Sequence, residues 1–122
     1  AEVRKVVPHA KIWLHSCGAI RDLIPDFIEM GVDILNSLQP RAAGMDQAAL
    51  KREFGRDLVF HGGLDMQGAL SGTPAQAAEE ARRCLDALAA GGGYVFAPSN
   101  HFMQDIPLAN FYAVYEVARD YR

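Results

Sequence analysis

Short apolar runs alternate with longer stretches of helical periodicity along this chain. The apolar runs occupy residues 12–14, 32–36, 58–60 and 94–97. Apolar side chains recur three and four positions apart, or strong helix formers predominate, in the stretches between and after them, at residues 20–28, 47–54, 74–90 and 107–121. Short apolar strands that alternate with helices indicate an α/β protein with a parallel sheet. We therefore expect four β/α units.

Residues that cap or interrupt helices mark the boundaries of these units. Asp46 and Thr73 are expected to be N-caps, and Pro74 suits the first helical position. Pro25 lies inside the first helical stretch, which must either kink there or begin its regular part there. Gly62 and Gly63 are expected to close the third strand. No linker or low-complexity segment divides the chain, so we expect a single domain over residues 1–122.

Polar residues follow each of the four strands, which bears on the architecture. They occupy residues 15–18, 36–40, 61–63 and 98–101. An open doubly wound sheet and half of a closed barrel both fit four β/α units. Barrel enzymes build their sites from the ends of several strands, whereas open sheets more often use one switch point. No Gly-x-Gly-x-x-Gly or P-loop pattern follows any strand. This pattern favours half of a barrel.

Composition narrows the classes of partner and compartment. The formal net charge is −3, so the chain has no basic surplus for nucleic acid. No apolar run approaches the ~20 residues that span a bilayer. The two cysteines make no disulfide framework, and we expect a cytoplasmic protein. The absence of an initiator Met and the helical start lead us to expect a piece of a longer protein.

Four motifs at the strand ends carry a family resemblance. Residues 15–18 resemble a His-x-Cys-Gly element, and residues 32–36 with Gln39 resemble a D-I-L-N-P-x-Q strand. Residues 60–65 are similar to a G-N-x-D-P element, and residues 93–98 resemble a last barrel strand. Together they resemble the uroporphyrinogen decarboxylase superfamily, which includes porphyrinogen decarboxylases and cobalamin-dependent methyltransferases. The resemblance implies the C-terminal half of a TIM (β/α)8 barrel.

A candidate metal pair lies at the end of the first strand. His15 and Cys17 are two positions apart on an extended segment, which puts both side chains on one face. Both are good zinc ligands, and a catalytic zinc usually has three protein ligands. The resemblance implies a third ligand after the last strand, where this chain has Asn100 in place of the methyltransferase Cys. We expect His101 to be that ligand. In the alternative interpretation, His15 and Cys17 are structural.

Other polar residues at the strand ends are candidates for catalysis and substrate binding. The predicted catalytic residues are His61, Asn100 and His101. The predicted substrate-binding residues are Asn36, Gln39, Gly62, Gly63 and Asp65, and the two glycines would allow close approach to an anionic substrate. For each of these five, a local role in a turn or a loop is the alternative.

Residues outside the predicted site are expected to have structural roles. Asp105 is expected to cap the last helix, and Cys84 to lie in the core. The aromatic residues Phe111, Tyr112 and Tyr115 recur at helical spacing and are expected to pack.

The resemblance implies an enzyme, and two of its chemistries remain open. The first is methyl transfer from a corrinoid, with a corrinoid protein as partner, to a thiol activated by zinc. The second is removal of acetate-arm carboxylates from a tetrapyrrole without a cofactor. A truncated, non-catalytic half barrel is a third alternative. Because half a barrel has two apolar strand edges, we expect a homodimer or pairing with a missing N-terminal half.

Overall fold

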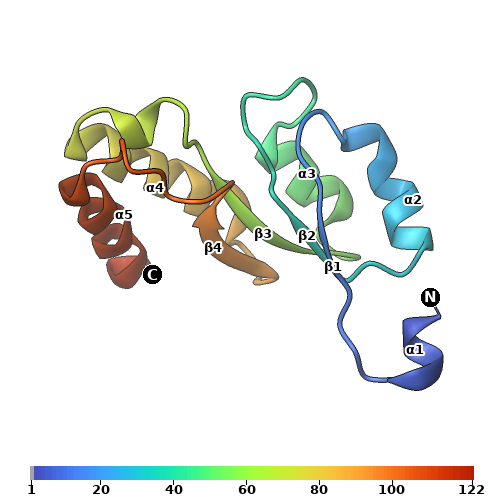
Figure 1. The fold of residues 1–122 in the computed structure, drawn as a ribbon. Helices are drawn as coiled ribbons and strands as arrows, with labels where there is room; N and C mark the ends of the chain where they lie inside the picture. Colours follow the sequence, from blue (N-terminus) through green and yellow to red (C-terminus); the bar gives the residue numbers. More distant parts are fainter. Residues whose placement is uncertain (1) are drawn as a thin grey trace.

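Four parallel strands form one sheet at the centre of the molecule (Figure 1). The computed structural model describes residues 2–122. The strands lie in the order β1-β2-β3-β4, and their bounds are β1 (Trp13–His15), β2 (Ile34–Asn36), β3 (Val59–Leu64) and β4 (Tyr94–Pro98). The helices between and around them are α1 (Val3–Val6), η1 (Arg21–Leu23), α2 (Ile24–Glu29), α3 (Gln47–Phe54), η2 (Ala69–Ser71), α4 (Pro74–Leu88) and α5 (Leu108–Asp120). The predicted alternation of strands and helices is confirmed.

Strand register divides the sheet into two faces with different burial. In parallel pairs, side chains that are aligned across the sheet point to the same face. Leu35 and Phe60 are aligned and fully buried in the hydrophobic core, where each contributes about 1.5–3 kcal/mol by burial. Trp13 belongs to the opposite row, and about 49% of its surface is exposed. One face of the sheet therefore carries the core, and the other lies open.

The predicted helix starts are observed as hydrogen-bonded caps. Asp46 accepts a hydrogen bond from the backbone N–H of Ala49 at 2.7 Å. Thr73 and Gln76 form a reciprocal capping box at the start of α4. Pro25 lies in the first turn of α2, because its missing N–H costs nothing at that position. The first helical stretch thus begins its regular part at Ile24 instead of kinking.

The third strand departs from its predicted end. β3 continues through Gly62 and Gly63 to Leu64, so the prediction that the two glycines close the strand was wrong. Both have positive φ, 108° and 99°, which glycine adopts readily. The Gly63 N–H donates to the carbonyl oxygen of Ser37 at 3.1 Å, and a Cβ at Gly63 would lie 2.8 Å from Gln47 Nε2. The glycines therefore allow neighbouring elements to approach the strand closely.

The predicted cap of the last helix was also wrong. Pro107 precedes α5 as its N-cap residue, and no side chain, Asp105 included, caps that helix. Pro107 itself has a ψ of 139° and lies outside the helix, which begins at Leu108. None of the helices within residues 2–122 has the length and hydropathy to cross a bilayer.

Candidate functional site

A cleft opens at the carboxyl ends of the four strands, and we call it the mouth cleft. Its volume is about 420 Å³. The residues that line it are Trp13, His15, Asn36, His61, Ala97, Pro98, Ser99, Asn100, His101, Phe102, Phe111 and Tyr115. Every strand contributes, because parallel strands end at one edge of the sheet. The structure thus brings five of the predicted site residues together in one cavity.

His15, Cys17 and Asn36 form a chain of contacts beside this cleft. The Cys17 sulfur lies 3.2 Å from His15 Nε2, and His15 Nδ1 is hydrogen-bonded to Asn36 Oδ1. An amide oxygen only accepts, so this hydrogen bond requires the ring proton on Nδ1. The Asn36 amide group donates in turn to the carbonyl oxygen of His61 at 2.9 Å. Cys17 itself is exposed.

Trp13 and His61 form a second pair on the open face of the sheet. The indole N–H of Trp13 donates to His61 Nδ1 at 3.1 Å. Partial burial lowers the pKa of His61 below its ordinary value, which favours the neutral ring that this bond requires. Sequence reasoning missed Trp13 as a site residue. Its spacing of two from His15 on the same strand was the signal that could have found it.

His101 lies apart from the His15–Cys17 pair. Its backbone N–H and its Nδ1 both contact Asn100 Oδ1, at 2.8 and 2.9 Å. Within residues 2–122, no group of three or more His, Cys, Asp or Glu side chains is close enough to hold a metal ion. The donors that the structure does bring together, an imidazole nitrogen and a thiol, suit zinc in kind. In number they fall one short of a catalytic zinc site.

A second cleft adjoins the mouth cleft and shares Asn100 and His101 with it. Its volume is about 390 Å³, and Gln39 and Asp65 also line it. Gln39 Oε1 accepts a hydrogen bond from the Gly18 N–H at 2.7 Å. The Asp65 carboxylate is bound by Arg41 Nε at 2.8 Å and by the Gln67 N–H at 3.0 Å. Gln39 and Asp65 therefore each bind the loop that follows the preceding strand, as well as lining a cavity.

Comparison with known proteins decides the family. The chain matches the family model described as uroporphyrinogen decarboxylase (URO-D) over residues 1–121. The chain belongs to the URO-D family. This confirms the resemblance carried by the four strand-end motifs, and with four parallel strands the sheet is consistent with half of a TIM barrel. No curated protein matches the chain.

Behind the site, a buried polar layer supports β3 of this URO-D chain. The Tyr94 hydroxyl donates to the Gly62 carbonyl oxygen at 2.7 Å and lies 3.1 Å from the Cys84 sulfur. Gln47 Nε2 donates to the Gly63 carbonyl oxygen at 2.7 Å. Burial raises the pKa of Cys84 to about 11. Cys84 is thus a structural thiol, and the two glycines lie inside the sheet between this layer and the mouth cleft.

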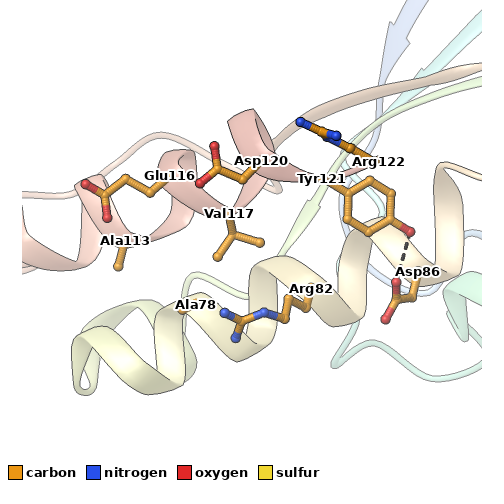
Figure 2. Close-up of a pocket in the computed structure, with 9 residues that line it drawn as sticks. All are labelled: Ala78, Arg82, Asp86, Ala113, Glu116, Val117, Asp120, Tyr121 and Arg122. Atoms are coloured by element: carbon orange, nitrogen blue, oxygen red, sulfur yellow. Dashed lines mark hydrogen bonds between the residues drawn. The ribbon is translucent and has the colours of Figure 1, made fainter.

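A further cavity lies on the outer surface of the URO-D half barrel, between α4 and α5 (Figure 2). Its volume is about 490 Å³. The Tyr121 hydroxyl at the end of α5 donates to the Asp86 carboxylate on α4 at 2.9 Å, and Figure 2 shows this bond at one end of the cavity. None of the predicted site residues lines it. We take it to be a groove between packed helices.

Proposed function

We propose that this chain carries half of the active site of a URO-D-family methyltransferase. In this proposal a corrinoid donates a methyl group to a thiol, and His15 and Cys17 are two of the ligands of a zinc ion that activates the thiol. Bound zinc would supply the charge that keeps a substrate thiol deprotonated. The observation that carries the proposal is the contact of 3.2 Å between Cys17 Sγ and His15 Nε2 at the rim of the mouth cleft.

The third ligand is the least complete part of this site. We propose His101, which lines the same cleft as His15. In the part of the chain that the structure describes, His101 is too far from His15 and Cys17 to share a metal ion with them. Coordination by His101 therefore requires the loop after β4 to move. Asn100, the residue before it, is a poor ligand for zinc and would orient His101 through their hydrogen bond.

The part of the mouth cleft that this chain forms suits a neutral, methyl-bearing group. No Lys, Arg, Asp or Glu occurs among the described residues that line it, and the lowered pKa of His61 favours a neutral ring. Burial of an unpaired charge is costly, so the carboxylates of a tetrapyrrole would need cations from the other half of the barrel.

Cobalt(II) substitution tests the metal pair directly. A Co²⁺–thiolate bond produces a charge-transfer absorption that oxygen and nitrogen ligands do not. We expect this band on titration of the protein with Co²⁺, its loss in Cys17→Ser, and its retention in Cys84→Ser, the matched control at the other cysteine. Zinc should displace the cobalt at about one equivalent. A protein that takes up no metal, or a band unchanged in Cys17→Ser, would refute the proposal.

Decarboxylation without a metal is the second candidate function. It is favoured by the lack of a three-donor group within residues 2–122. In this alternative, His61, Asn100 and His101 would stabilise charge that develops on the substrate. Gln39 and Asp65, which line the second cleft, would hold the substrate. Binding of uroporphyrin by a metal-free protein, measured by quenching of Trp13 fluorescence, would support this alternative.

The open sheet face supports a proposal about assembly. Trp13 on β1 and Val95 on β4 are 49% and 46% exposed, although both lie in apolar strands at the two edges of the sheet. We propose that these edges pair with a second copy or with an N-terminal half barrel. Light scattering after gel filtration should show a dimer that dissociates on dilution. A folded monomer at every concentration would contradict self-association and leave the N-terminal half as the partner to test by co-expression.

A further inference from the structure

We infer that Asn36 is a positioning residue, which holds the His15 ring in a single tautomer with Nε2 directed at Cys17. The side chain of Asn36 lies at the end of β2, aligned with His15 of the neighbouring strand. Its Oδ1 contacts His15 Nδ1, and its Nδ2 donates to the His61 carbonyl oxygen at 2.9 Å. One amide thus joins the ends of β1 and β2 to the middle of β3.

The burial of Asn36 distinguishes this role from substrate binding. Only 6% of the residue is exposed, and both its oxygen and its nitrogen have partners within the protein. Rotation of the amide by 180° would place an N–H₂ group against His15 and an oxygen against the His61 carbonyl, where two acceptors would face each other. The His61 carbonyl therefore sets the orientation of the Asn36 amide, and this amide sets the tautomer of the His15 ring.

The hydrogen bond to Asn36 determines, without any bound ligand, which His15 ring nitrogen is free to bind one. With the ring proton on Nδ1, Nε2 is a lone-pair donor 3.2 Å from the Cys17 sulfur. Histidines that bind metals generally donate their other ring N–H to an acceptor, which sets both tautomer and orientation. In this one respect the inference rests on the proposed function, since it gives the metal pair its preorganisation. The tautomer itself requires no metal.

Nitrogen-15 NMR of the histidine rings tests the tautomer in the metal-free protein. We expect the His15 resonances, assigned with His15→Gln, to show a protonated Nδ1 and an unprotonated Nε2 in the wild type. Asn36→Leu removes the acceptor and should shift His15 towards the Nε2–H tautomer. Asn100→Leu is the matched control, because Asn100 contacts His101 instead. It should change the His101 ring and leave His15 unaltered.

The wild-type spectrum alone can overturn the inference, whether or not the variants fold. A His15 ring that is protonated at Nε2 in the wild type would do so, as would a folded Asn36→Leu protein with an unchanged His15 tautomer. Cobalt titration of the same variants adds the functional arm. Affinity should fall about 10–100-fold in Asn36→Leu and stay unchanged in Asn100→Leu with respect to the Cys17-dependent band. The expected tautomer without metal uptake would refute the methyltransferase proposal and leave the role of Asn36 intact.

Discussion

Replacement of Gly63 by alanine tests whether neighbouring elements approach β3 too closely at this position to accommodate a side chain. A Cβ at this position would lie 2.8 Å from Gln47 Nε2, 3.1 Å from Cys84 Sγ and 3.2 Å from Leu88 Cδ1. Gly63 also has a φ of 99°, which costs a residue with a Cβ roughly 1–2 kcal/mol. Overpacking of a buried site typically adds about 1–3 kcal/mol. We therefore expect Gly63→Ala to lower the free energy of unfolding by about 2–5 kcal/mol.

Gly91 provides the matched control for this substitution. Its φ is 74°, so alanine meets a similar backbone cost, but no atom lies within 4 Å of the added Cβ. Urea unfolding of both variants, followed by circular dichroism, should show Gly63→Ala less stable than Gly91→Ala by about 1–3 kcal/mol. Equal losses in the two variants would mean that the polar layer behind β3 relaxes freely, and the close-approach argument would then be wrong.

Three further outcomes are expected from the buried and polar groups. The free energy of unfolding should fall between pH 9 and 11 by up to about 3 kcal/mol. The unfolded chain releases the Cys84 proton near pH 9, whereas burial holds the pKa of this thiol at about 11 in the folded protein. Cys84→Ala should flatten this dependence on pH, measured by urea unfolding. Protonation of His61 should break the hydrogen bond that it accepts from Trp13, and the lowered pKa of His61 means that this requires a pH below about 6.5. The fluorescence of the single tryptophan should therefore change with falling pH in the wild type and not in His61→Gln. Thr73→Ala should cost about 1 kcal/mol in thermal or urea unfolding, since it removes one half of a capping box; an unchanged midpoint would contradict the cap assignment.

Local sequence signals predicted most of the fold because they act over short distances. The roles of the apolar runs as strands and of Asp46 and Thr73 as N-caps depend on only a few neighbouring residues. The structure confirms these roles. Gly62 and Gly63 misled because a glycine pair marks a turn in most local contexts. Here Gly62 is approached closely by Ser37, and Gly63 is approached closely by Gln47 and Cys84. These contacts come from residues distant in the sequence, which no local pattern contains.

The sequence predicted which strand ends supply the residues of the candidate site, but only some of the contacts among those residues. The rule that parallel strands end at one edge was enough to gather His15, Asn36, His61, Asn100 and His101 in one cleft. The bond between Asn36 and His15 depends on the register of β1 against β2, which no pattern within either strand contains. The separation of His101 from His15 depends likewise on how far apart the outer strands of the sheet lie.

The division of the sheet into a buried and an open face also bears on how substitutions should be interpreted. In β1, in β4 and in β3 as far as His61, successive side chains point to opposite faces of the sheet, so the position along the strand separates substitutions that unfold the chain from those that alter what it binds. Replacing Leu35 or Phe60 removes core volume, whereas replacing Trp13 or Val95 mainly changes a surface offered to other molecules. A mutational scan of these strands should therefore yield abundance and binding phenotypes that alternate residue by residue, whereas residues 62–64 are all buried and should affect abundance alone.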